Sequence, residues 1–209
     1  PAAGNGSQNF AVFLFTGLVV WLLFAGMING SMGWLMAIGD LRRKVFFPPE
    51  TAIFGSGLAL AVQSAIEAGV LLVVMLLIGN IGPTTLLLPI VLALAGIFGL
   101  GLGFFVCVVN TYYRDVQYLV GIILNAVFFL VPIVYPLGII PESHWGLPIR
   151  RIVELNPINQ FVAAARESAY LLQWPSLSRW CALVCYSFAA FALGWRFFAQ
   201  RSMQLSEDM

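Results

Sequence analysis

Long uncharged runs of apolar residues alternate along this chain with short stretches that carry most of its charges. Apart from Glu67, no charged residue lies between positions 51 and 113, and the runs 10–39, 116–141 and 180–195 carry none. A helix rises 1.5 Å per residue, so about 20 residues cross a hydrocarbon core of roughly 30 Å. We therefore predict spanning helices at 11–38, 52–78, 84–109, 117–135 and 178–197.

The apolar residues of these runs occupy both parities of the sequence, whereas the strands of a membrane barrel alternate apolar and polar residues. The predicted fold class is all-α integral membrane, with one transmembrane domain over 1–209. Composition agrees, since 61% of the residues are hydrophobic and 9% are charged, against about 25% charged in soluble domains. The net charge of +1 conceals no basic stripe, which speaks against nucleic acid as a partner and leaves membrane lipid as the surroundings.

Basic residues in the short connections set the orientation. Those beside the spans are Arg42, Arg43, Lys44, Arg114 and Arg201. Because short basic loops stay in the cytoplasm, we expect 39–51, 110–116 and the C-terminus there. Loop 79–84, region 136–177 and the start of the chain then lie outside. An outside start followed by five spans leads us to expect an earlier span before Pro1.

The outer region 137–172 does not have the pattern of an ordinary loop. Asn156 and Pro157 form a helix start, with Asn as N-cap and Pro at the first helical position, and we predict a helix to about Leu172. A second short helix is predicted at 147–154. The longer one would measure about 24 Å, short of a full crossing. We therefore expect two short re-entrant helices in the outer leaflet.

Two prolines mark the outer end of the run 117–135. Pro132 and Pro136 flank Tyr135, and each removes a backbone donor, so the helix should end or bend here. A plain helix terminus and a hinged outer gate are both compatible with this pattern.

Glu67 is the one acid well inside a predicted span, and Gln63 lies one turn before it on the same face. A carboxyl group at that depth costs a few kcal/mol, which makes it a functional candidate. The alternative is an interhelical hydrogen bond inside the bundle.

Four residues stand just before the span 117–135, at its predicted inner mouth: Tyr112, Tyr113, Arg114 and Asp115. We predict an ion pair or a substrate-facing role for Arg114 and Asp115, with both tyrosines at the membrane interface. A helix-end pair that only fixes the loop explains the same residues.

No catalytic or metal-binding constellation is evident in the sequence. Cys107, Cys181 and Cys185 have no acid or histidine at ligand spacing, and His144, the only histidine, lies in a polar stretch. A P-loop needs a lysine after a glycine-rich turn, and the sole lysine, Lys44, follows Arg43. If ATP drives this protein, we expect another polypeptide to hydrolyse it.

The order of motifs resembles the membrane subunit of type-2 ABC transporters, in the branch that exports lipid-linked O-antigen, teichoic acid, galactan or capsule chains. The matching segments are GLVVW at 17–21, LRRKVFFPPE at 41–50, GLGLGFFVCVVNTYYRDV at 99–116, VPIVYP at 131–136 and NPINQFVAAARE at 156–167. Two features depart from the family. Its cytosolic interface helix and first span are missing here, and Val131 stands where the family commonly has Ser.

The resemblance implies a homodimer with the translocation path between the copies, each resting on a nucleotide-binding subunit that holds ATP and Mg. It also implies that 39–50 docks on that subunit and that 137–172 forms outer gate helices. The implied coupling residues are Arg42, Arg43, Lys44, Phe46, Phe47, Pro48 and Glu50. The implied outer gate residues are Pro132, Tyr135, Pro136, Asn156, Pro157 and Arg166.

A path for a glycan on a polyprenyl lipid needs aromatic faces that pack against sugar C–H surfaces. The candidates to line it are Trp21, Phe24, Trp34, Phe128 and Phe129, and core or lipid-facing packing is the alternative for each. The expected function is therefore the permease subunit of an ATP-driven polysaccharide exporter in a bacterial inner membrane. Drug or small-lipid efflux on the same scaffold is the main alternative, and a proton-coupled carrier or membrane glycan enzyme is a third.

Overall fold

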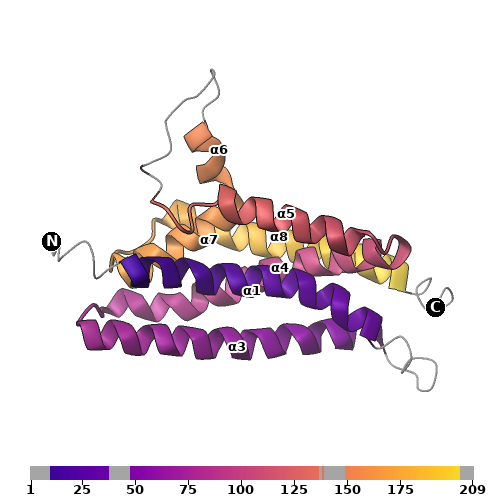
Figure 1. Cartoon of the computed structure of the whole chain (residues 1–209), viewed down its shortest axis with the longest axis horizontal. Helices are drawn as coiled ribbons and strands as arrows, with labels where there is room; N and C mark the ends of the chain where they lie inside the picture. Colours follow the sequence, from indigo (N-terminus) through magenta and orange to yellow (C-terminus); the bar gives the residue numbers. More distant parts are fainter. Residues whose placement is uncertain (1–9, 38–47, 137, 139–148, 203–209) are drawn as a thin grey trace.

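The computed structural model describes residues 10–37, 48–136, 138 and 149–202. Every regular element in these ranges is a helix, which confirms the all-α class (Figure 1). The elements are α1 (Phe10–Ala37), α3 (Pro49–Ile78), η1 (Pro83–Leu87), α4 (Leu88–Tyr112), α5 (Val116–Leu130), α6 (Ile149–Leu155), α7 (Pro157–Ala165), η3 (Arg166–Tyr170) and α8 (Leu177–Ser202).

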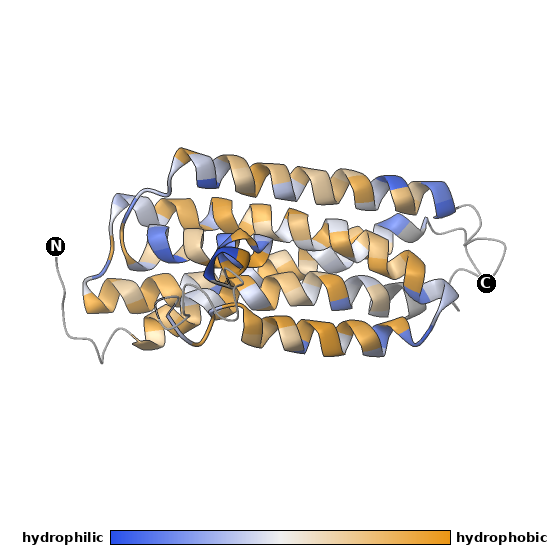
Figure 2. Ribbon diagram, turned by 90° about the horizontal axis from the view of Figure 1, so that it is seen from above, coloured by the Kyte–Doolittle hydropathy of each residue, from blue (hydrophilic) through white to orange (hydrophobic). Residues whose placement is uncertain are grey.

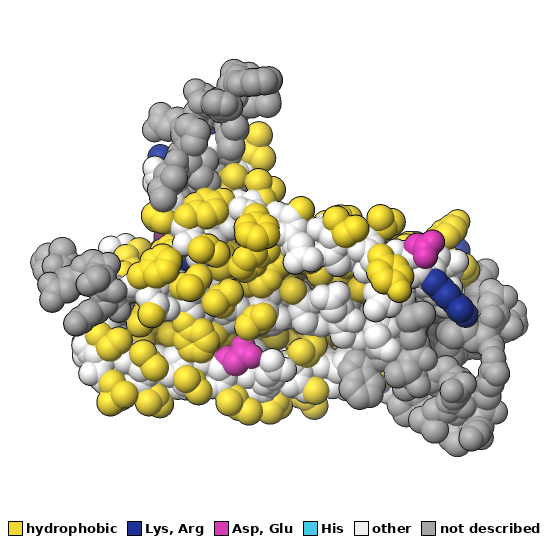
Figure 3. Space-filling view, viewed as in Figure 1, with side chains coloured by type: hydrophobic (Ala, Val, Ile, Leu, Met, Phe, Trp, Pro, Cys, Tyr) yellow, Lys and Arg dark blue, Asp and Glu magenta, His cyan; other side chains and the backbone are white. Residues whose placement is uncertain are grey.

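Within the described residues, four helices are long and apolar enough to cross a membrane. These segments are Phe10–Gly33, Glu50–Ile78, Pro83–Tyr112 and Leu177–Arg201. Apolar residues dominate the length of the long helices (Figure 2), and few charged side chains interrupt the face seen in Figure 3. The exposed surface therefore matches a hydrocarbon environment.

The prediction of a fifth full span at 117–135 is wrong in its length. Helix α5 has 15 residues, about 22 Å, because it ends at Leu130. Val131 has extended backbone angles, φ −78° and ψ 132°. The residue before a proline is disfavoured in the helical region, and Pro132 itself cannot donate a hydrogen bond.

The long helices lie side by side and alternate in direction (Figure 1). Helices α1, α4 and α8 run one way, while α3 and α5 run the other. One end of the bundle, here named the inner end, therefore carries the turn 113–115 and the end of α8. The opposite, outer end carries 79–87, 131–136 and 171–176, so the connections alternate as the orientation argument requires.

Helix α1 runs through the middle of the bundle and contacts α3, α4, α5, α7 and η3. Small residues allow the closest of these approaches. Gly26 and Gly30 both pack against the Leu60 side chain of α3, at 3.1 Å from an added Cβ. On α4, Gly99 belongs to a second pair of glycines four residues apart, and it lies against Met27 of α1. Both glycine pairs serve helix packing, as small residues do in membrane helices.

Helices α4 and α8 approach each other backbone to backbone. A Cβ added at Gly194 of α8 would collide with the Gly101 carbonyl of α4, and one at Gly101 would collide with the backbone of 190–191. Ser187 strengthens the crossing, because its hydroxyl donates to the Leu94 carbonyl at 2.8 Å. The two helices therefore pack directly on each other's backbone at this crossing.

Replacing Gly194 with alanine is expected to lower the thermal midpoint of the protein in detergent, measured by circular dichroism. The collision with Gly101 should cost about 1–3 kcal/mol, more than the gain of up to about 1 kcal/mol from higher helix propensity. Gly121→Ala on α5 is the matched control, since an added Cβ there meets no atom within 4 Å. Equal midpoints for the two variants would contradict the close approach.

Candidate functional site

Arg166 lies at the outer end of the bundle and joins three separate parts of the chain. Its Nη1 donates to the Pro132 carbonyl and its Nη2 to the Ile133 carbonyl, each at 2.6 Å. Its Nε donates to the Phe13 carbonyl at 3.4 Å, and Cζ lies 3.5 Å from the centre of the Phe13 ring. The guanidinium thus ties the segment after α5 to α1 and to η3, and we call this contact set the Arg166 clamp.

The clamp is buried, because Arg166 is 8% exposed. Within the part of the chain that the structure describes, carbonyl oxygens and an aromatic ring hold its charge, and no carboxylate pairs with it. Gly17 makes room for it, since an added Cβ would lie 2.8 Å from Nη2. Removing the guanidinium would leave buried carbonyls without donors, which costs more than the bonds contribute when present.

The predicted break after α5 is confirmed. Tyr135 folds back on the helix end, where its hydroxyl lies 3.0 Å from the Phe129 carbonyl and 3.2 Å from the Leu130 carbonyl. Carbonyls of a last helical turn lack intrahelical partners, so this side chain takes the place of a cap. Pro136 follows in irregular backbone. Hinge motion at this break stays a prediction.

The predicted helix start at Asn156 is also confirmed. The Asn156 Oδ1 accepts from the Ile158 N–H at 3.0 Å, and Pro157 occupies the first turn of α7. Helix α7 continues into the π-helical η3, which ends at Tyr170, two residues before the predicted end at Leu172. Leu172 has a φ of +53°, a left-handed conformation that stops the helix. The shorter outer helix is α6, described from Ile149 to Leu155, and the first two residues of its predicted range, 147–154, lie outside the described residues.

A polar network that the sequence reasoning missed attaches these outer helices to the spans. Arg179 of α8 forms an ion pair with Glu167 and donates from Nε to the Gln160 Oε1 at 3.1 Å. Asn80, just after α3, donates from Nδ2 to the Tyr170 carbonyl at 3.1 Å. Glu167 and Arg179 lie in different elements, so only their isolated charges in an apolar chain could have suggested a pair.

At the inner end, Asn110 fixes the turn between α4 and α5. Its Oδ1 accepts from the Gln117 N–H at 3.0 Å, and the side chain is buried. Asn110 stands in the NTYYRD motif, but nothing in the local sequence distinguishes it as the residue that holds the turn. The α4–α5 turn is therefore held from within rather than by its charges.

The four predicted inner-mouth residues are exposed on that turn. Tyr112 and Tyr113 have 43% and 70% of their surfaces accessible, as interfacial tyrosines would. Arg114 and Asp115 are exposed too, and no ion pair joins them. The ion-pair interpretation is therefore wrong within the described residues, because the two adjacent side chains stay in a high-dielectric environment. A substrate-facing role stays a prediction.

Most of the predicted coupling segment lies outside the described residues. This applies to Arg42, Arg43, Lys44, Phe46 and Phe47. Pro48 and Glu50 are described, at the N-terminus of α3. The Thr51 N–H and hydroxyl both donate to the Pro48 carbonyl, at 3.1 and 2.6 Å, so the segment enters α3 through a fixed turn.

Among the described residues, Glu67 makes no interhelical hydrogen bond of the kind that we considered for it. Its partner is Gln63 on the same helix, whose Nε2 donates to the Glu67 Oε1 at 2.9 Å. Gln63 is exposed, because the tightly packed face of α3 is occupied by Leu71 and Met75. The pair therefore presents polar atoms on the outside of this chain, halfway along a span.

The aromatic residues predicted to line the path include both buried core residues and exposed surface residues. Trp21 and Phe24 are 7% and 4% exposed, and their rings pack on Phe128 and Phe98. In this arrangement both are core residues, because they lie on the side of α1 that packs against α4 and α5. Phe129 is 71% exposed and free to face a partner or substrate. The side chain of Trp34 lies outside the described residues.

The described side chains do not assemble a reactive centre. Among the described residues, no group of three His, Cys, Asp or Glu side chains lies close enough to hold a metal ion. What the arrangement can do is mechanical: the break after α5, the outer helices and α1 meet at a single buried cation.

Comparison with known proteins gives a consistent set of similarities. A model of the ABC-2 type transporter family matches residues 3–170. The O-antigen export system permease protein of Myxococcus xanthus is 26% identical over 204 residues, covering 96% of this chain and 76% of that protein. The polysialic acid transport protein of Escherichia coli is 28% identical over 157 residues, covering 71% of this chain and 60% of that protein. An O-antigen export permease of Klebsiella pneumoniae is 25% identical, covering 76% and 60% respectively.

Replacing Arg166 with methionine is expected to destabilise the outer end by about 3 kcal/mol or more, because buried carbonyls lose charged donors. Arg166→Lys should recover less than half of this loss, since an ammonium lacks the planar fork that reaches two carbonyls at once. Amide hydrogen exchange should rise most at 131–136, and this local readout distinguishes the clamp from general packing.

Arg151→Met is the matched control for the clamp, since Arg151 is an exposed arginine of α6. It should change the thermal midpoint little. If Arg166→Met left exchange at 131–136 at the level of this control, the clamp would not hold the break.

Proposed function

Because the chain belongs to the ABC-2 type transporter family, we propose that it is the permease subunit of an ATP-driven exporter that moves lipid-linked polysaccharide outward across a bacterial inner membrane. The observation that carries the proposal is the similarity to an O-antigen export permease over 96% of the chain. The spans that follow one another through the bilayer support a transport role.

The proposed partners supply the functions that this chain would need from other molecules. ATP hydrolysis is assigned to a separate pair of nucleotide-binding subunits, which hold ATP and Mg. A second copy of this chain supplies the other wall of the path, and the substrate is a glycan on a polyprenyl carrier. In this arrangement the inner end of the bundle and the C-terminus face the cytoplasm, in line with the basic residues of the short loops.

Energy reaches the path through contact with the ATPase. Residues 40–50 combine three cations with a Phe-Phe-Pro-Pro segment, which suits a stiff docking surface on an acidic, partly apolar partner. Pro48 connects this segment to α3 through the Thr51 turn, so movement of the ATPase is transmitted to a 30-residue helix. A loop that served only as a topological anchor would not need the aromatic and proline residues.

The outer end supplies the exit in this proposal. Opening it requires the α5 break to move away from α1, which breaks the bonds of the Arg166 clamp. Helix α5 is suited to that movement, since Leu124 is its one buried residue. The clamp would then keep the exit closed when no substrate is present.

Deleting the gene in its host is the direct test. Lipid-linked glycan should accumulate in the cytoplasmic leaflet, and the wild-type chain should restore export. Glycan export that persists in the deletion strain, with loss of resistance to a drug, would replace this proposal with an efflux function on the same scaffold.

The double variant Arg43→Ala, Phe47→Ala is expected to restore export poorly in that strain and to lose co-purification with the ATPase subunit. The control is Arg151→Ala, which removes a cation from the opposite side of the membrane in the proposed orientation. Unchanged association and unchanged export in the double variant would reject the docking role.

Arg114→Ala is expected to reduce export without loss of the folded protein, because Arg114 is exposed and free of ion pairs among the described residues. A cation at the inner mouth can attract the phosphate of a carrier lipid. Comparing export at equal membrane levels of the two proteins checks this, and full activity would refute the substrate-facing role.

A further inference from the structure

Three polar side chains face outward from the spans α1 and α3. Asn29 of α1 and Gln63 of α3 are exposed, and Glu67 of α3 is partly exposed. Glu67 lies about 27 Å of helix from Pro49 and about 16 Å from Ile78, the two ends of α3. Figure 3 shows acidic atoms about halfway along the bundle, with apolar side chains around them. We call the surface formed by these three side chains the polar face of α1 and α3.

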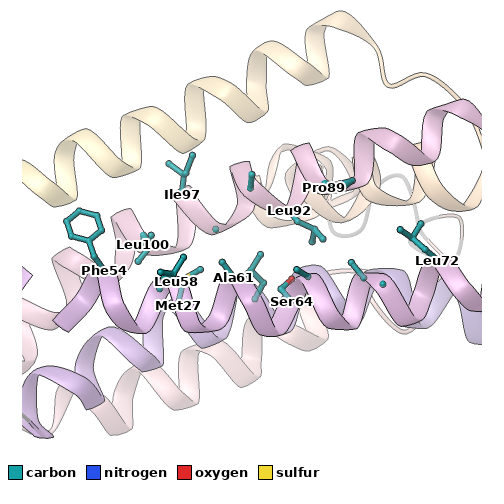
Figure 4. Close-up of a pocket in the computed structure, with 17 residues that line it drawn as sticks. Met27, Phe54, Leu58, Ala61, Ser64, Leu72, Pro89, Leu92, Ile97 and Leu100 are labelled. Atoms are coloured by element: carbon teal, nitrogen blue, oxygen red, sulfur yellow. The ribbon is translucent and has the colours of Figure 1, made fainter. Parts of the chain in front are cut away.

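The three polar side chains lie on one side of the contact between α1 and α3. The two helices meet where Gly26 and Gly30 pack against Leu60. On the side of α4, Met27 and Ala61 border an apolar groove, to which none of the three polar residues belongs (Figure 4). With about 100° of rotation per residue, the three polar residues project from the opposite side of both helices. The polar face is therefore not covered by α4.

Glu67 and Gln63 satisfy each other only in part. The Gln63 Nε2 donates to the Glu67 Oε1 at 2.9 Å. Within the described residues, the Glu67 Oε2 and the Gln63 Oε1 accept no hydrogen bond. Hydrocarbon offers no donor, and a carboxylate that deep in a bilayer is costly. The polar face therefore needs a partner that donates to both oxygens.

The two open acceptors and the negative charge determine the chemistry of that partner. A hydroxyl has one proton to donate, and an ammonium is a point charge on a flexible stem. A guanidinium has five N–H donors in a planar fork and keeps its charge. An arginine can therefore donate to Glu67 and Gln63 together while it balances the carboxylate.

A second copy of this chain does not supply that arginine. The described spans carry three arginines, all of them within about 10 Å of helix from the ends of α8. A spanning helix needs about 20 residues. The stretches of the chain outside the description are each too short for one, namely 1–9, 38–47, 139–148 and 203–209. The arginine therefore belongs to another polypeptide.

We propose that the polar face of α1 and α3 binds a membrane-spanning helix of another polypeptide, whose arginine at mid-depth donates to Glu67 and Gln63. Small residues on this face let the backbone of a partner helix approach closely. An added Cβ at Gly33 of α1 meets no atom within 4 Å, and Ala59 of α3 is exposed. Asn29 offers a further hydrogen bond nearer the inner end. The contact does not depend on which substrate is transported.

Photocrosslinking of the full chain in proteoliposomes tests this. The probe is a synthetic spanning peptide of leucine and alanine with one central arginine, and the reference peptide has leucine in its place. Val70→benzoylphenylalanine puts the crosslinker beside the polar face, since Val70 is 51% exposed and lies one turn beyond Glu67. The arginine peptide should crosslink about three- to tenfold more than the reference. Glu67→Gln, which keeps the size of the side chain, should lower its yield to that of the reference.

Leu58→benzoylphenylalanine is the matched control, since Leu58 is 69% exposed and lines the groove on the side of α4. Crosslinking there should not distinguish the two peptides. Glu154→Gln removes a carboxyl from α6, outside the spans, and should leave the yield at Val70 unchanged. If Glu67→Gln does not fold, judged by elution, Gln63→Leu removes the second acceptor and should lower the yield.

Equal yields for the two peptides at Val70 would overturn the proposal. An unchanged yield in a folded Glu67→Gln or Gln63→Leu protein would overturn it too. Crosslinks between two copies of the chain at Val70 that exclude the peptide would assign the polar face to a second copy, against the proposal.

Discussion

A helix that breaks near a membrane must find new partners for the backbone groups it releases, because hydrocarbon offers none. In this chain Pro132 sets the break after Leu130, and Arg166 supplies the new hydrogen-bond partners. Its guanidinium donates to the carbonyls of Pro132 and Ile133 while it stacks on Phe13. One side chain therefore joins the segment after α5, η3 and the first turns of α1.

The rest of the bundle divides into a rigid part and a loosely held one around that contact. Helices α1, α4 and α8 pack closely, with Gly101 and Gly194 bringing two backbones together. Helix α5 buries little of itself, and elements with few buried contacts move at the lowest cost. A transporter needs both properties, since movement imposed at the inner end reaches the outer end only if some helices stay intact while one yields.

The sequence predicted those features that depend on local chemistry. Uncharged runs located the spans, Asn156 and Pro157 located the start of α7, and Pro132 located the break. The length of α5 was overestimated, because the run of apolar residues continues past the proline that ends the helix. Partners far apart in sequence could not be found, as with Arg166 and Phe13, since a helix that is apolar all round does not reveal which face is buried. For the same reason Trp21 and Phe24 could not be recognised as core residues.

In the proposed function, ATP hydrolysed by a partner drives a lipid-linked glycan through this chain. The most direct measurement uses proteoliposomes that contain the chain, its ATPase subunit and a glycan on a polyprenyl carrier, with a lectin that detects glycan on the far side. ATP with Mg should make the glycan accessible to the lectin, and the glycan should stimulate hydrolysis. Hydrolysis that proceeds without any glycan crossing, or crossing driven by a proton gradient without ATP, would contradict the account.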